Sequence, residues 1–254
     1  MSNFWILFIL AICSYLLGNV NWALIISKMK NTDIRKMGSG NPGTLNMSRN
    51  LGLKFGLLTF FLDIMKGVIP TLVAFFLLKD KYFDGCGYVV GDFAIYLCGL
   101  CAVLGHIYPV FLKFKGGKGI ATTIGVFLVC SCAYGATWTA VVIMALVAAL
   151  AFIYFTEFGA MGSFIAITPP AVGASIRLFL LYGTNLDSKT ITFYVLSNML
   201  IFAICLFTWF AHRLNIKRML AGEEHPTSIK EMVVKMKAKK AQAKLEAENK
   251  ENDN

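Results

Sequence analysis

Seven apolar runs, each about long enough to cross a bilayer, constrain this chain more than any other feature. A membrane core about 30 Å thick takes about 20 residues of helix. Of the 254 residues, 57% are hydrophobic and only 15% are charged, whereas soluble domains carry about 25% charged residues. The sequence therefore predicts an all-α, polytopic integral membrane protein with seven transmembrane helices. The predicted spans are 4–27, 55–78, 93–112, 119–135, 137–156, 163–182 and 190–211.

Two places in these runs leave the path of the chain open. The fourth and fifth spans form one apolar stretch that breaks near 131–135, so a five-span model with merged or re-entrant segments stays possible. Pro169 and Pro170 predict a kink or break in the sixth span, because proline lacks the N–H that a helix needs. The first run is too long for a signal-peptide core and is expected to be a true span.

The distribution of lysine and arginine predicts the orientation in the membrane. With the N-terminus outside and the C-terminus in the cytoplasm, nineteen of these residues face the cytoplasm and only Lys79, Lys81 and Lys189 face outward. Residues 1–227 are expected to form the membrane domain. Residues 228–254 form a basic cytoplasmic tail, either disordered or amphipathic on anionic lipid. The apolar residues at helical spacing in this tail are Ile229, Met232, Val233 and Met236.

Two small, polar, glycine-rich segments interrupt the apolar pattern. The first island is 38–52 and the second island is 113–119. Glycine lets backbone N–H groups turn toward an anion, and lysine and arginine add positive charge. The predicted orientation places both islands, the 156–163 junction and the polar segment 212–218 on the cytoplasmic face. This pattern predicts a phosphate site at a membrane surface, and the spacing is not that of a nucleoside triphosphatase loop.

Several side chains in these segments are candidates for chemistry. Ser39 can be a nucleophile, a hydrogen-bond donor to phosphate or a turn residue, and Arg49 offers a planar fork for two phosphate oxygens. The second island opens the fourth helix, where Thr122 and Thr123 can add hydroxyl groups. His212 can move a proton or hold a substrate hydroxyl.

Charged residues inside the spans are functional candidates in any membrane protein. Asp63 and Lys66 lie three residues apart on one helix face, and a buried structural pair is expected. Arg177 lies near the outer end of the sixth span and is expected to snorkel. His106, alone in an apolar run, is expected to be structural.

Cysteine usage gives no sign of a cofactor. The seven cysteines lie mostly within apolar runs, and the Cys98-x-x-Cys101 pair is expected to be small buried residues rather than a redox or zinc site. No metal and no cofactor are therefore predicted.

Taken together, these residues resemble the bacterial acyl-phosphate:glycerol-3-phosphate acyltransferases, the PlsY family, from about residue 15 to 225. The resemblance rests on three separate motifs, which together cover most of the chain. They are Asp33-Ile34-Arg35-Lys36 with Gly38-Ser39-Gly40-Asn41, Thr44-x-Asn46 and Arg49; Gly105-His106-x-Tyr108-Pro109 through Lys113 to Thr122; and His212-Arg213-x-Asn215-Ile216-x-Arg218 with Gly222 and Glu224.

The resemblance implies a seven-helix enzyme of phospholipid synthesis in the bacterial inner membrane, with its active site on the cytoplasmic side. It implies transfer of a fatty acyl group from acyl phosphate to the 1-hydroxyl of sn-glycerol 3-phosphate, giving lysophosphatidic acid and phosphate. Nucleic acid is not an expected partner, and the oligomeric state is left open. The catalytic residues that it implies are Ser39, Arg49, Lys118 and His212. The substrate-binding residues expected with them are Gly38, Gly40, Asn41, Gly43, Thr44, Asn46, Lys115, Gly116, Gly117, Gly119, Ser163, Asn215 and Glu224.

This chain departs from the family pattern at a few positions. Pro42 stands where the family usually has an aliphatic residue, Leu45 where it often has alanine, and Glu157 and Ala160 where it tends to have a basic residue and a serine. A transporter for a phosphate-bearing solute is the alternative, because seven spans, a broken helix and basic loops suit one. For the enzyme, direct attack is favoured over an acyl-Ser39 intermediate, because no His–Asp relay accompanies that serine. The proton acceptor stays open between His212 and the departing phosphate.

Overall fold

Helices make up almost all of the described structure. The computed structural model describes residues 3–184, 187–224, 226–227, 230–231, 234 and 238. Within this part, only a bridge between Tyr82 and Val89 is not helix, turn or loop, so the all-α prediction is confirmed. The elements are α1 (Asn3–Gly18), α2 (Trp22–Met29), η1 (Ile34–Lys36), α3 (Thr44–Leu51), α4 (Leu53–Leu78), α5 (Val90–Ile107), η2 (Val110–Leu112), α6 (Ile120–Cys132), α7 (Ala136–Thr156), α8 (Gly159–Tyr182), α9 (Ser188–Ala211) and α10 (Arg213–Leu220).

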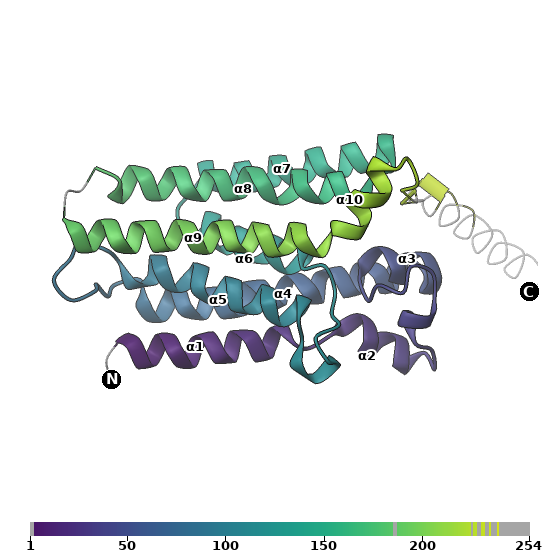
Figure 1. Ribbon diagram of the computed structural model, residues 1–254, viewed down its shortest axis with the longest axis horizontal. Coiled ribbons are helices and arrows are strands. Elements are labelled where there is room, and N and C mark those ends of the chain that lie inside the picture. The colour runs from purple at the N-terminus through teal and green to yellow at the C-terminus, as the bar shows by residue number, and fades with distance from the viewer. Residues whose placement is uncertain are drawn as a thin grey trace, which may run out of the picture.

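The long helices lie side by side in one elongated bundle (Figure 1). Six segments in the described part of the chain are long and apolar enough to cross a membrane. The predicted fourth span is shorter, because α6 has 13 residues and rises only about 20 Å. Most of its residues are buried against other helices, so protein rather than lipid surrounds its polar ends. The predicted boundary between the fourth and fifth spans is confirmed, since α7 begins at Ala136.

The first predicted span is confirmed as an apolar segment long enough to cross a membrane, Asn3–Met29, but it is not one continuous helix. It divides into α1 and α2 at residues 19–21, where the Asn21 side chain accepts a hydrogen bond from Leu24 N and caps α2. The break frees the carbonyl of Val20, which accepts a hydrogen bond of 2.7 Å from the buried Lys66 ammonium. The break therefore provides a backbone acceptor for the buried Lys66 ammonium inside the bundle.

Of the kink or break predicted in the sixth span, the break does not occur. Helix α8 runs from Gly159 to Tyr182 and includes Pro169 and Pro170 in its interior. A membrane helix tolerates proline where neighbouring helices support it, and Pro170 is buried within the bundle. Nor does Arg177 snorkel, because its side chain is buried and its Nη2 lies 3.2 Å from Asp92 Oδ1 on α5.

Small residues bring α4 and α6 into close contact. A Cβ on Gly67 would lie 2.1 Å from the Thr122 carbonyl oxygen, and a Cβ on Gly125 would lie 2.2 Å from that of Ile64. Glycine at both positions lets the two backbones touch, as at many membrane helix crossings. This contact sets the start of α6, and with it the second island, against the charged middle of α4.

The polar segments gather at one end of the bundle. In Figure 1, α2, α3 and α10 lie at one end with the loop that leads into α6, whereas the N-terminus and the loop between α4 and α5 lie at the other. The predicted convergence of both islands with the segment after the last span is therefore confirmed. The proposed amphipathic residues of the tail, 229, 232, 233 and 236, lie outside the described residues.

Candidate functional site

The first island is a tight loop that a single amide side chain holds together. Asn46, at the start of α3, donates from Nδ2 to the carbonyls of Ile34 and Met37, and its Oδ1 accepts from Ser39 N at 3.1 Å. Gly38 has φ of +53°, where a Cβ would lie 2.5 Å from this same Oδ1. Because these bonds occupy both ends of its amide, the structure gives Asn46 a supporting role for the loop.

Ser39 lies on the exposed side of this loop. Its residue is exposed, and its hydroxyl oxygen receives only a long contact of 3.5 Å from Asn41 N. The hydroxyl proton is thus available to an incoming oxygen atom. In the described structure, neither a histidine nor a carboxylate side chain forms a hydrogen bond with it, which gives no support to an acyl-Ser39 route.

The second island rests on His106. The backbone N–H groups of Gly116 and Gly117 donate to the carbonyls of Ile107 and His106, each at 3.1 Å. A Cβ on Gly117 would lie 2.2 Å from His106 Nε2, and one on Gly116 would lie 2.0 Å from the His106 carbonyl oxygen. The two glycines therefore let the chain cross directly over the end of α5.

Beneath this crossing lies a buried cluster of charged and polar groups. Lys66 Nζ is 2.9 Å from Asp63 Oδ1 and 2.8 Å from His106 Nδ1. Since the ammonium has no lone pair, the imidazole nitrogen accepts, which makes Nδ1 the unprotonated nitrogen of His106. The predicted structural pair of Asp63 and Lys66 is confirmed, and it extends to the histidine that supports the second island.

Lys118 leads a chain of contacts to the last helix. Its Nζ donates to Asn215 Oδ1 on α10 at 2.5 Å, and Asn215 Nδ2 donates to Glu224 Oε1 at 2.8 Å. Arg218 Nε lies 3.4 Å from the other oxygen of Glu224. Burial lowers the pKa of Lys118 to about 8, against the opposing pull of the Glu224 carboxylate. The structure thus brings together three predicted residues from two distant motifs.

His212 lies at the junction of α9 and α10, near the Lys118 end of these hydrogen bonds. Its Nδ1 lies 2.9 Å from the Thr208 carbonyl, which can only accept, so Nδ1 carries the proton and Nε2 keeps its lone pair. Burial, and then the positive charge of Lys118, lower the pKa of His212 to about 4. The ring is therefore neutral at physiological pH, and its Nε2 is a hydrogen-bond acceptor.

Arg49 projects from the last turn of α3 toward the segment that follows α10. Its Nε donates to the Thr227 carbonyl and its Nη2 to the Pro226 carbonyl, both at 3.1 Å. Burial lowers its pKa, while the carboxylates of Glu157 and Glu224 oppose that shift. The guanidinium remains partly exposed, and it lies within electrostatic reach of Lys118.

An apolar groove of about 610 Å³ runs along α8 from this polar end. Phe164 lines it, and the ring of Phe164 lies 5.5 Å from that of His212. Val172 and Ile176, farther along the groove, are about half exposed on the outside of the bundle. The groove therefore connects the surroundings of His212 with the lipid-facing surface.

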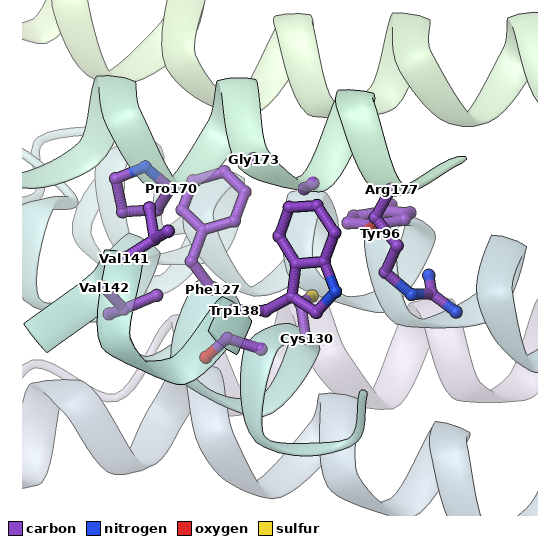
Figure 2. Close-up of a pocket in the computed structure, with 11 residues that line it drawn as sticks. Tyr96, Phe127, Cys130, Trp138, Val141, Val142, Pro170, Gly173 and Arg177 are labelled. Atoms are coloured by element: carbon purple, nitrogen blue, oxygen red, sulfur yellow. The ribbon is translucent and has the colours of Figure 1, made fainter. Parts of the chain in front are cut away.

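A smaller cavity of about 20 Å³ adjoins the groove across Trp138, Val141 and Gly173, which line both. Figure 2 shows the indole of Trp138 among its lining residues, with Phe127 on one side and Arg177 at one end. The cavity lies away from the two islands, and its walls are mostly apolar.

The other predicted site residues lie either in the loops or at the starts of helices. Ser163 lies in the first turns of α8, where its Oγ donates to the Gly159 carbonyl at 2.8 Å. Lys115 is exposed on the second island. The hydroxyl groups of Thr122 and Thr123 do not belong to the site. They are buried, where Thr122 Oγ1 donates to the Asp63 carbonyl and Thr123 Oγ1 bonds with Thr208 Oγ1. The remaining predicted residues lie on the first island or the start of α3 (Gly40, Asn41, Gly43 and Thr44) or directly before α6 (Gly119).

Other residues of the site could not be recognised in advance. Phe164 looks like any apolar residue of its helix, and nothing in the sequence marks the carbonyls of Pro226 and Thr227 as partners of an arginine. Arg218 belongs to the third motif, but its link to Glu224 depends on the chain turning at Gly222, which has φ of +72°. Among the described residues, no group of three or more His, Cys, Asp and Glu could hold a metal ion.

Comparisons with known proteins agree in both sequence and structure. The family model for glycerol-3-phosphate acyltransferase matches residues 8–222. The glycerol-3-phosphate acyltransferase of Aquifex aeolicus is 36% identical over 217 residues, covering 85% of this chain and 96% of the relative. That of Mycoplasmopsis pulmonis is 34% identical over 230 residues, covering 88% of this chain and 96% of the relative.

Two crystal structures of PlsY (YgiH), an integral membrane glycerol 3-phosphate acyltransferase, are similar to this chain. The glycerol 3-phosphate form has a TM-score of 0.67 and the lysophosphatidic acid form one of 0.65. Each is 33% identical and covers 87% of this chain and 94% of the crystallised one. On this evidence, the chain belongs to the glycerol-3-phosphate acyltransferase family.

Proposed function

We propose that this acyltransferase takes its acyl group from acyl phosphate and places it on the 1-hydroxyl of sn-glycerol 3-phosphate. The products are lysophosphatidic acid and inorganic phosphate. The relatives include a PlsY structure with glycerol 3-phosphate and one with lysophosphatidic acid, which supports this acceptor and this product. The transporter alternative finds no support among these relatives, all of which are acyltransferases.

The observation that carries the proposal is the cationic cluster beside an apolar groove. The positive charge of Arg49 helps to lower the pKa of Lys118, and the positive charge of Lys118 helps to lower that of His212, whose ring lies 5.5 Å from that of the groove residue Phe164. A substrate pair with two phosphate groups and one long hydrocarbon chain needs such an arrangement. Arg49 and Lys118 hold the phosphates and His212 orients the glycerol, while Asn215, whose amide is bonded to Lys118 and Glu224, orients Lys118.

The first island contributes neutral donors to the same phosphates. Ser39 presents its hydroxyl, and the glycines around it let backbone N–H groups approach an anion closely. These groups also stabilise the negative charge that develops on the carbonyl oxygen during transfer. Glu224 fixes Asn215 and Arg218 rather than touching an anionic substrate, because a carboxylate would repel it.

The chemical step needs no covalent enzyme intermediate. The glycerol 1-hydroxyl attacks the carbonyl carbon, a new ester C–O bond forms, and the C–O bond to phosphate breaks. His212 Nε2 accepts the hydrogen bond of the attacking hydroxyl, and the proton passes to the departing phosphate. A histidine with a pKa of about 4 suits this orienting role better than that of a strong base. Acyl phosphate is already activated, so positioning supplies most of the catalysis.

The acyl chain lies in the groove along α8, open to lipid on one side. Seven crossings follow if α6 counts as a short, protein-surrounded span. The N-terminus is then outside, and both islands face the cytoplasm of the bacterial inner membrane. The excess of lysine and arginine at the polar end of the bundle supports this orientation.

The test is a two-substrate assay with purified protein. Palmitoyl phosphate and glycerol 3-phosphate together should yield phosphate and 1-acylglycerol 3-phosphate in equal amounts, and either substrate alone should yield neither. Palmitoyl coenzyme A in place of palmitoyl phosphate should give no product. Transfer from the coenzyme A ester alone would overturn the proposed donor.

Two substitutions test the proposed roles of the cations. Arg49→Ala and Lys118→Ala should each lose most of the activity, while the protein still inserts into the membrane. Lys54→Ala, which removes an exposed lysine at the start of α4, is the matched control and should leave turnover unchanged. Near-normal turnover in both site variants would contradict the phosphate assignment.

A further inference from the structure

The segment after α10 forms hydrogen bonds with two other parts of the chain, α3 and the turn between α7 and α8. The carbonyls of Pro226 and Thr227 accept the hydrogen bonds of Arg49 on α3. The N–H of Thr227 donates to the Glu157 carbonyl at 3.1 Å, at the turn between α7 and α8. We call Pro226 and Thr227 the strap. It lies beyond residue 222, where the match to the family model ends.

The side chain of Thr227 fills a small apolar site between these elements. Thr227 is only 1% exposed, and its methyl group lies where a Cβ on Gly159 would come within 2.8 Å. That same Cβ would lie 3.4 Å from Leu45 on α3. In the described structure the Thr227 hydroxyl is buried without a hydrogen-bond partner, so apolar packing rather than a side-chain hydrogen bond holds this side chain in place.

We infer that the strap is a positioning element for the reaction, which holds the Arg49 guanidinium in the orientation that binds a substrate phosphate. This inference rests on the proposed role of Arg49 as a phosphate ligand. It assigns a function in catalysis to a part of the chain outside the family match.

The number of Arg49 donors that the strap uses indicates that the strap positions the guanidinium rather than blocking it. A guanidinium has five N–H donors, and the strap uses one on Nε and one on Nη2. Among the described residues no hydrogen bond reaches Nη1, so this edge is left for two phosphate oxygens. Carbonyl acceptors leave the positive charge of Arg49 intact, whereas a blocking carboxylate would neutralise it. A long side chain that is already fixed loses less conformational entropy when it binds its ligand.

The test displaces the strap without touching Arg49. Thr227→Lys puts a cation into a buried apolar site next to Arg49, so the strap should move away from Arg49 and from α3. Thr227→Val keeps the shape and removes only the unpartnered hydroxyl, so it should retain the strap and wild-type kinetics. In the full chain, we expect Thr227→Lys to raise the KM for one of the two substrates about tenfold, with a smaller change in kcat.

A double-variant comparison and a chemical readout complete the test. In an Arg49→Lys background, Thr227→Lys should raise KM no further, because the guanidinium group that the strap orients is absent. Independently of activity, phenylglyoxal should modify Arg49 faster in Thr227→Lys than in the wild type, as measured by peptide mass spectrometry. If the wild type proves inactive with palmitoyl phosphate, the proposed function fails, and the modification rates still decide whether the strap shields Arg49.

Three results would overturn the inference. Unchanged kinetics with unchanged modification would show that the strap does not hold Arg49. A rise in kcat/KM would make the strap an inhibitor. An equal KM effect in the Arg49→Lys background would make the effect of Thr227→Lys a general structural one.

Discussion

Gly117→Ala is the sharpest structural test of how the second island is placed. The added Cβ would lie 2.2 Å from His106 Nε2, whereas non-bonded heavy atoms normally stay about 3.5 Å apart. The ring cannot simply rotate away, because Lys66 holds its Nδ1 at 2.8 Å inside a buried cluster. The loop must therefore move by about 1.3 Å, and Lys118 is the next residue.

That displacement has a predictable effect on catalysis. A misplacement of about 1 Å in a site built on positioning can cost about 100-fold in rate. We expect kcat/KM for glycerol 3-phosphate to fall by about that factor, in the phosphate-release assay with palmitoyl phosphate. Membrane insertion and the detergent-solubilised elution profile should remain those of the wild type, because the clash lies at the end of α5 rather than along the packed length of the bundle.

Gly135→Ala is the matched control for this experiment. Gly135 has φ of +112°, and no atom lies within 4 Å of a Cβ built there. The same substitution thus adds backbone strain between α6 and α7 without a collision. It should keep most of the activity. Activity of Gly117→Ala within threefold of the wild type would refute the idea that close packing on His106 places Lys118.

Three further predictions concern charge, stability and the first island. The pKa of Lys118 is lowered to about 8 by burial, so its positive charge is present below that pH and is lost above it; kcat/KM should decline as pH rises through about 8. In Lys118→Arg the group stays charged, so the decline should disappear even if the rate is lower, and an identical alkaline limb would assign it to another group. Lys66→Ala leaves the buried Asp63 without its cation, which costs about 3–5 kcal/mol, and should lower the thermal unfolding temperature far more than Lys54→Ala does. Ser39→Ala should reduce kcat about 100-fold if the hydroxyl binds a reacting oxygen, and ample residual turnover would make Ser39 a turn residue.

Much of the fold follows from the apolar pattern. The predicted starts and ends of most spans agree with the helices to within a few residues, because lipid requires long apolar helices. The apolar pattern does not reveal the break at 19–21, where Asn21 caps α2 and Lys66, 46 residues farther along, donates to the Val20 carbonyl. Nor can a local rule for proline show that neighbouring helices support α8 through Pro169 and Pro170.

The site was predictable where residues stand in motifs and unpredictable where the fold brings backbone atoms together. Lys118, Asn215 and Glu224 stand in the second and third motifs of the family resemblance, and the structure joins them through two hydrogen bonds. Asn46 has the same kind of side chain but uses it on its own loop. Only the three-dimensional arrangement shows that Asn46 supports its own loop, whereas Asn215 bridges Lys118 and Glu224 from two motifs.

The most direct test of the whole account is the sidedness of the polar segments in a membrane. In a variant without its native cysteines, single cysteines would replace Lys36 near the first island, Lys115 on the second, Arg213 on α10 and Lys81 at the opposite end. Labelling of intact bacterial spheroplasts with a membrane-impermeant maleimide should modify only the cysteine at 81. The other three should react only after permeabilisation. Reaction of any of those three from the same side as position 81 would contradict the convergence of the phosphate-binding segments at one membrane face.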